Sequence, residues 1–193
     1  GELGYRLKSL AVARLEGDEL ELHVGTQLVR RDSPLAEVGG AYNAIRLVGD
    51  AVGRVWFHGM GAGRMPTASA VVADLIDSVV GRTAITFRTL QLWSERPARV
   101  LPKPSATAAT RYYLRFTVQD HPGVLADITG ALSKQGISIA SFIQHEKHEG
   151  PSDRIPLIIM THQTTVGAAD RALEEIHQLE MVHEPAMRLR ILD

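Results

Sequence analysis

Three glycines, Gly59, Gly61 and Gly63, lie between the apolar stretch RVWFH and a long amphipathic run that begins at Pro66. A glycine turn between a strand and a helix can hold a phosphate, because the backbone approaches closely and the first helical N–H groups are unpaired. In the dinucleotide fingerprint G-x-G-x-x-G, an acidic residue about 20 positions on binds the ribose. Here Arg64 and Met65 displace the third glycine, and the next predicted strand, near TAITF, ends without an acidic residue. Spacing alone therefore favours a structural turn, and it leaves open a loop that closes over a cofactor held mainly elsewhere.

A second candidate is the segment DHPGVLADI, residues 120 to 128. Asp120 can cap a helix, and Gly123, two residues after His121, leaves the backbone uncovered. The N–H groups of Val124 and Leu125 can then meet an anion such as the carboxylate of a free amino acid. Taken alone, a capped helix after a tight turn explains the same residues, so both interpretations stay open.

Other reactive side chains form no recognisable arrangement. His145 and His148 lie in a charged loop, HEKHEGPSDR, where solvated charge is a better explanation than a metal site, which needs ligands from several elements. Lys8 and Lys103 have no evident acidic partner, and no Ser-His-Asp set stands out. We expect no metal and no catalytic residue in this chain.

Composition narrows the class of protein. The 193 residues are 45% hydrophobic and 22% charged, which predicts a packed core. The net charge of −1 argues against nucleic acid as a partner, and no apolar run is long enough to span a membrane. The absence of cysteine excludes disulfides and fits a cytoplasmic location. The first residues, GELGYRLKSL, lack an initiator Met and a signal-peptide pattern, so we expect a piece of a longer chain.

Hydrophobic periodicity in the first half predicts two hairpins and a helix. Strands are expected over 7–15 and 20–29, around Gly17-Asp18, and over 43–48 and 54–58. Apolar residues at spacings of three and four then predict a helix from Pro66 to the stop at Gly81. One more strand is expected over 84–90.

The second half predicts the order β-α-β-β-α-β of a ferredoxin-like domain. Alternating strands are expected at 112–118, 137–143, 155–159 and 187–191, with helices that begin near Leu125 and Ala169. Both helices should cover one face of a four-stranded antiparallel sheet, and the other face needs a partner, often a second copy.

A Pro-rich stretch separates the halves. Residues 94–110 lack apolar periodicity and read as an exposed linker between residues 1–93 and residues 111–193. The predicted fold class is α+β, with a partial mixed-sheet domain followed by the ferredoxin-like domain.

Two groups of segments resemble known families. ELGYRLKSLAVARLEGDELELHV, AYNAIRLVGDAVGRVWFHGMGAG and the pattern GAG-x-x-PTASAVV-x-D resemble the later part of homoserine dehydrogenase. DHPGVLADITGALSKQGISIASF and the β-α-β-β-α-β order resemble an ACT domain, as found on the longer bacterial homoserine dehydrogenases.

The resemblance implies NAD(P)-dependent interconversion of homoserine and aspartate semialdehyde in threonine, methionine and isoleucine synthesis. It also implies that the nucleotide-binding domain and the catalytic Lys with its carboxylates precede this segment, so the chain alone should be inactive. By the same resemblance, Gly59, Gly61, Ala62 and Gly63 line the edge of NAD or NADP. The resemblance further implies an amino-acid effector, threonine, bound by Asp120, His121, Gly123, Val124 and Leu125, and a homo-oligomer, dimer or tetramer. The alternative is a non-catalytic module for amino-acid sensing or dimerisation.

Overall fold

The computed structural model describes residues 3–92, 100–144 and 154–192. The chain forms two compact units, one from residues 1–32 and 99–193 and the other from residues 33–98. The hairpin at the start of the chain therefore packs with the second half of the sequence. The fold is α+β, as predicted, with one mixed sheet and one separate two-stranded sheet.

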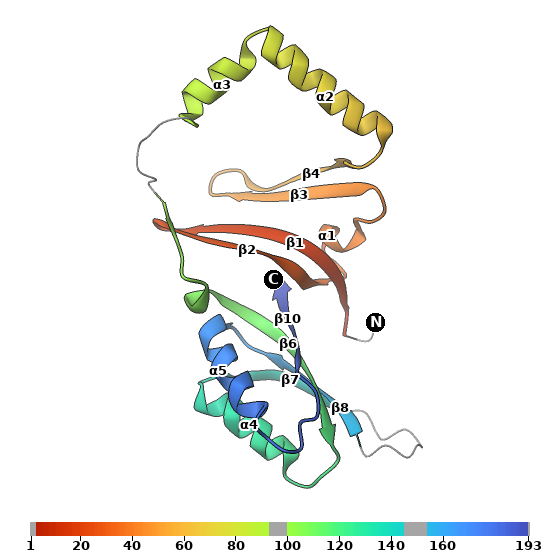
Figure 1. Ribbon diagram of the computed structural model, residues 1–193, viewed down its shortest axis with the longest axis vertical. Coiled ribbons are helices and arrows are strands. Elements are labelled where there is room, and N and C mark those ends of the chain that lie inside the picture. The colour runs from red at the N-terminus through yellow and green to blue at the C-terminus, as the bar shows by residue number, and fades with distance from the viewer. Residues whose placement is uncertain (1–2, 93–99, 145–153, 193) are drawn as a thin grey trace. The chain divides into compact units, whose positions relative to one another are not determined.

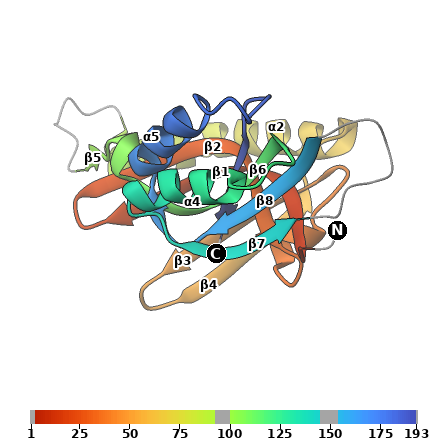
Figure 2. The same ribbon diagram turned by 90° about the horizontal axis from the view of Figure 1, so that it is seen from below.

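The first unit is built on a four-stranded antiparallel sheet covered on one face by two helices (Figures 1 and 2). Its strands lie in the order β10 (Met187–Leu192), β6 (Ala109–Gln119), β8 (Arg154–Thr161) and β7 (Ile139–Gln144). The helices are α4 (Val124–Lys134) and α5 (Val166–Ile176). The predicted β-α-β-β-α-β order is confirmed. The predicted loop with His145 and His148 lies almost wholly outside the described residues.

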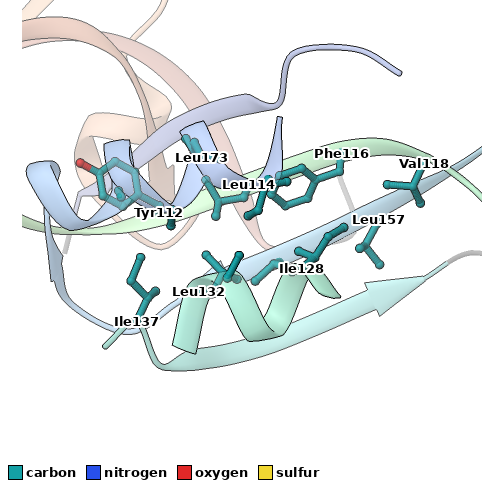
Figure 3. Packing of buried hydrophobic residues seen from close by; sticks show 14 of the residues in the cluster. Tyr112, Leu114, Phe116, Val118, Ile128, Leu132, Ile137, Leu157 and Leu173 are labelled. Carbon is teal, nitrogen blue, oxygen red and sulfur yellow. The ribbon is translucent and has the colours of Figure 1, made fainter. Parts of the chain in front are cut away.

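The core of this unit lies between the sheet and the two helices (Figure 3). Tyr112, Leu114, Phe116 and Val118 alternate along β6 and are at most 1% exposed, because alternate residues of a strand face the same side. They pack against α4, whose apolar residues recur at helical spacing. Each fully buried apolar side chain of this kind contributes about 1.5–3 kcal/mol.

The hairpin of β1 (Tyr5–Glu16) and β2 (Glu19–Arg30) extends the sheet beyond β10. The hairpin and its turn at Gly17-Asp18 were predicted, and the structure places Gly17 in the left-handed region at φ 61°. Its attachment was not predicted: β2 pairs with β10 in parallel, and Leu28 lies in register with Ile191. Both side chains are buried in a second apolar cluster with Met160. The sheet is therefore mixed, with six main strands in the order β1-β2-β10-β6-β8-β7.

The predicted linker is folded where the structure describes it. β5 (Leu101–Pro102) pairs with β2, and η1 (Ser105–Thr107) and the short β9 (Thr164–Thr165) lead into β6 and α5. Ala108 is 2% exposed, whereas Leu101, Pro102 and residues 104–107 are exposed, so the described part of the predicted linker forms short elements and remains largely exposed; residues 94–99 lie outside the described part.

Lys103 is ion-paired, contrary to expectation. Its Nζ lies 2.6 Å from Oε2 of Glu16, and this hydrogen bond raises the pKa of Lys103 above its ordinary value. The prediction that Lys103 lacks an acidic partner was wrong because the two residues are far apart in the sequence.

The second unit contains α1 (Pro34–Glu37), a hairpin and two helices. The hairpin pairs β3 (Tyr42–Gly49) with β4 (Gly53–Met60), and the helices are α2 (Arg64–Val79) and α3 (Arg82–Leu90). The predicted hairpin and the helix after Pro66 are confirmed. No residue of α2 is buried, and Leu75 and Ile76 of its apolar stripe are more than half exposed.

The strand predicted over 84–90 is wrong, because these residues form α3. Gly81 adopts φ 81° and lets the chain begin a new helix directly after α2. Gln91, also left-handed at φ 55°, ends it. A short apolar run such as AITF fits a strand or a helix equally well, and the sequence offers no longer pattern to decide between them.

Replacing Phe116 by Ala should lower the free energy of unfolding of the first unit by about 3–5 kcal/mol, because the change leaves a cavity in a fully buried site. Urea unfolding followed by circular dichroism measures the loss. Phe142→Ala, at a position 38% exposed, is the matched control and should cost much less. Equal losses in the two variants would contradict this assignment of the core.

Candidate functional site

The predicted cofactor loop is a tight turn that joins β4 to α2. Gly59 lies near the end of β4 opposite Asn43 of β3. The amides of Gly61 and Ala62 both donate to the carbonyl oxygen of Ala41, at 3.1 and 3.4 Å. Gly63, with φ 123°, precedes the first residue of α2. The structure thus gathers Gly59, Gly61, Ala62 and Gly63 into one strand-to-helix turn.

Close packing explains why Gly61 is a glycine. A Cβ placed on Gly61 would lie 1.7 Å from Nδ2 of Asn43 and 2.9 Å from its Cγ. Gly59, by contrast, has no atom within 4 Å of such a Cβ. Two of the amides that a phosphate would need are already bonded to Ala41, so this turn can contact a ligand by close approach of its backbone and has few free donors.

The predicted effector turn precedes α4. Asp120, His121 and Gly123 are exposed, the Val124 side chain is buried in the core, and Leu125 is 37% exposed. The structure therefore brings the five predicted residues together in one turn at the beginning of a helix.

The expected capping by Asp120 is wrong. The residue before α4 is Gly123, which has φ 101° and makes no side-chain capping hydrogen bond. The amide of Val124 donates to the carbonyl oxygen of His121 at 3.2 Å, so it is not available to an anion. Leu125 retains one of the first-turn N–H groups that a helix leaves without an internal acceptor.

Sequence reasoning missed a polar cluster on β2. Glu21, His23 and Gln27 lie on one face of this strand because their positions differ by even numbers, and Glu21 and Gln27 are only 5% and 2% exposed. Arg190 of β10 lies in register with Gln27 and with Tyr112 of β6. The alternating polar residues in ELELHVGTQ and RLR could have indicated this cluster. A half-buried strand normally places apolar residues on its buried face, so polar residues at alternate positions are unusual there.

Ion pairs hold this cluster. Oε1 of Glu21 lies 3.4 Å from Nη1 of Arg190 and 3.2 Å from Nδ1 of His23, and Oε2 lies 3.9 Å from Nη1 of Arg14. The contact between Glu21 and His23 does not have hydrogen-bond geometry. Burial lowers the pKa of His23 below its ordinary value, and the positive charge of Arg190 lowers it further.

Residues 3–92, 100–144 and 154–192 contain no group of three or more metal-ligating His, Asp or Glu side chains. Within the same ranges, no helix is both long enough and apolar enough to cross a membrane.

The sheet, the two helices on its face and the glycine turn before α4 define an ACT domain. Residues 112–180 match the ACT domain family. Residues 1–76 match the homoserine dehydrogenase family, so the chain carries the C-terminal region of that family followed by an ACT domain.

Several homoserine dehydrogenases are similar in sequence to nearly the whole of this chain. Homoserine dehydrogenase of Pseudomonas aeruginosa is 40% identical over 197 residues, which cover 98% of this chain and 44% of that protein. The Neisseria gonorrhoeae homoserine dehydrogenase is 37% identical with the same coverage of both proteins. The crystal structure of a homoserine dehydrogenase from Thiobacillus denitrificans matches with a TM-score of 0.80 at 36% identity, over 100% of this chain and 43% of that one. The chain thus spans less than half the length of these relatives.

Gly61→Ala should lower the free energy of unfolding of the second unit by about 1–3 kcal/mol, because the new methyl group displaces Asn43 and overpacks the turn. Denaturation followed by tryptophan fluorescence, which includes Trp56 of β4, measures the change. Gly59→Ala is the control for the change of residue type, with no close neighbour. The double variant Asn43→Ala/Gly61→Ala should recover most of the loss, and a loss that persists there would contradict the contact.

Acidification should destabilise the first unit through His23. Its folded pKa is lowered, so between the unfolded value of about 6.5 and the folded value the unfolded chain binds a proton that the folded chain does not. The free energy of unfolding should therefore fall as the pH drops below about 6.5 and level off below the folded pKa.

The His23→Gln variant should show a shallower fall over this range in urea unfolding at several pH values. His183→Gln, at an exposed position, is the matched control and should keep the slope of the unmodified chain. The same slope in His23→Gln and in the unmodified chain would contradict the prediction.

Proposed function

We propose that this chain is the C-terminal region of an NAD(P)-dependent homoserine dehydrogenase, which interconverts L-homoserine and L-aspartate 4-semialdehyde in threonine, methionine and isoleucine biosynthesis. The observation that carries the proposal is the similarity along the chain. Identity of 40% extends over 98% of its length and includes both the homoserine dehydrogenase segment and the ACT domain. In this proposal, residues 1–93 complete the catalytic and dimerisation domain, and residues 111–193 are the regulatory domain.

The oxidoreductase chemistry belongs to groups outside this chain. When bound, the nicotinamide would supply hydride transfer with the alcohol carbon of homoserine, and a proton acceptor outside this chain would take the hydroxyl proton. The role of this chain is to place the turn of Gly59, Gly61, Ala62 and Gly63 against the edge of the cofactor. Because the amides of Gly61 and Ala62 are bonded to Ala41, this contact is one of packing rather than hydrogen bonding. The chain alone is therefore inactive.

The turn before α4 binds the amino-acid effector, which is threonine. The open space around Gly123 lets the backbone meet the ligand, and the positive end of the α4 dipole with the amide of Leu125 favours its carboxylate. The exposed carboxylate of Asp120 offers an acceptor for the ammonium group. The open surroundings of this turn support the proposal, and the occupied amide of Val124 limits the number of donors.

Assembly and location complete the proposal. The protein is a cytoplasmic homo-oligomer, a dimer or a tetramer. The exposed apolar residues of α2, among them Val71, Leu75 and Val79, support an assembly that covers them, because apolar surface of this kind marks a binding face.

A second candidate function is a non-catalytic module for amino-acid sensing or dimerisation. The complete sheet and both helices of the ACT domain favour it, since this part needs no other segment to form its core. The two proposals differ in whether the reading frame continues upstream into a strand–GxGxxG–helix unit.

The purified chain should show no NADP-linked or NAD-linked oxidation of L-homoserine, whereas the chain extended upstream should be active and inhibited by threonine. Absorbance at the nicotinamide band measures the activity, and calorimetric titration with L-threonine measures binding to the chain alone. Activity of the chain alone would contradict the proposal that the groups for hydride and proton transfer lie outside it. An upstream frame without a nucleotide-binding unit would favour the sensing module.

The variant Gly123→Val tests the effector turn, because a side chain at φ 101° is strained and covers the backbone. Threonine binding at this turn should be lost while the oligomer persists. Gly130→Val is the matched control, because Gly130 lies within α4 without an unusual φ and has open space around it. Unchanged threonine binding by Gly123→Val would rule out this turn as the effector site, and loss of the oligomer would favour a role in assembly.

A further inference from the structure

A polar cavity of about 230 Å³ lies in the first unit beside the middle of β2. β2 pairs with β5 at Glu19 and Leu20 and with β10 from Gln27 to Val29. Between these pairings, residues 21 to 26 pair only with β1 among the described strands. The cavity occupies this interval, and its wall includes His23, Gln27, Tyr112, Val166, Arg188 and Arg190.

Two deeply buried side chains in its wall have polar atoms without a hydrogen-bond partner in the described part of the chain. These atoms are Oη of Tyr112 and Nε2 of Gln27, whose residues are 1% and 2% exposed. The hydroxyl of Tyr112 points away from Leu114 and Phe116 of the apolar core (Figure 3). Buried polar groups are nearly always paired in folded proteins, so these two donors indicate a hydrogen-bonding ligand in the cavity.

The charges around the cavity favour an anion. Arg188 forms an ion pair with Asp170, and its guanidinium carbon lies 5.4 Å from the centre of the Tyr112 ring. Arg190 and Arg14, which lies outside the cavity wall, share the single carboxylate of Glu21, so one guanidinium charge near the cavity is in excess. Val166, the first residue of α5, also lines the wall, so the positive end of this helix dipole adds to the attraction.

We propose that this cavity binds a small carboxylate. Its wall supplies a hydroxyl, a primary amide and two guanidinium groups, which suits a carboxylate because that group accepts several hydrogen bonds and carries one negative charge. The volume of about 230 Å³ suits a small ligand. Free amino acids and simple hydroxy acids both carry this group.

This site shares no residue with the effector turn that begins at Asp120. It uses the first residue of α5 and side chains of β2, β6 and β10, and it does not depend on the proposed oxidoreductase function. A carboxylate here would bridge the hairpin and the ACT sheet at the place where their strands do not pair.

Nuclear magnetic resonance on the ¹⁵N-labelled full chain tests the proposal through the side-chain N–H signals of Gln27, Arg188 and Arg190. The probes are L-threonine, 3-hydroxybutyrate, which lacks the amino group, and L-threoninol, which lacks the carboxylate, all at constant ionic strength. Threonine, hydroxybutyrate or both should shift these signals, and threoninol should not. A shift by threonine alone identifies an amino-acid ligand, and shifts by both acids identify a general carboxylate site. Absence of shifts with both acids, or equal shifts with threoninol, would overturn the proposal.

Tyr112→Phe removes only the unpartnered hydroxyl and keeps the buried ring, so the fold should persist. It should weaken binding about tenfold or more, as expected for a lost hydrogen bond to a charged group. Tyr113→Phe, on the opposite face of the same strand, is the matched control and should bind normally. Gln27→Met is a second test and should weaken binding as well. Unchanged affinity in both Tyr112→Phe and Gln27→Met would overturn the proposal.

Gly123→Val separates this site from the effector turn. The shifts at Gln27 and Arg190 should persist in this variant even where threonine no longer binds at the turn. Loss of those shifts would mean that they report the turn at a distance, and it would overturn the inference without touching the proposed function.

Discussion

The parallel pairing of β2 with β10 is the constraint on which the first unit depends. Three residues of each strand are in register, Gln27 to Val29 with Arg190 to Leu192, and Leu28 and Ile191 are buried together. This short ladder makes the N-terminal hairpin part of the ACT sheet. It also ends at Gln27, so the middle of β2 approaches β10 through side chains rather than backbone. The ion pairs of the buried Glu21 and the polar cavity both lie where this backbone pairing has ended.

The sequence predicted the parts of the fold that local periodicity determines. Alternation from Tyr112 to Val118 and helical spacing around Ile128 and Leu132 identified the ACT core correctly, because each pattern is long enough to exclude its alternative. The run AITF was too short, and it is helical. The β2–β10 pairing and the contact between Lys103 and Glu16 join residues far apart in the chain, and no local pattern records such partners.

The two candidate turns use glycine for different physical reasons. Gly61 has an ordinary backbone conformation and is needed because Asn43 occupies the space of a side chain. Gly123 has open space around it and is needed because φ is 101°. Sequence reasoning found both turns from residue type and spacing. It could not show which backbone amides already donate hydrogen bonds within the protein. The hydrogen bonds to the carbonyl oxygens of Ala41 and His121 reduce the number of N–H donors that each turn can present to a ligand.

In the sequence, residues 33–98 separate the two segments that form the first unit, and this order has a consequence for synthesis on the ribosome. β2 emerges before its partner β10, which is translated roughly 160 residues later. Throughout that interval the nascent hairpin carries an unsatisfied edge with Leu28 and Val29, the kind of surface that recruits foreign strands and holdase chaperones. Truncations or stalls before Met187 would therefore leave the hairpin of β1 and β2 without its partner strand.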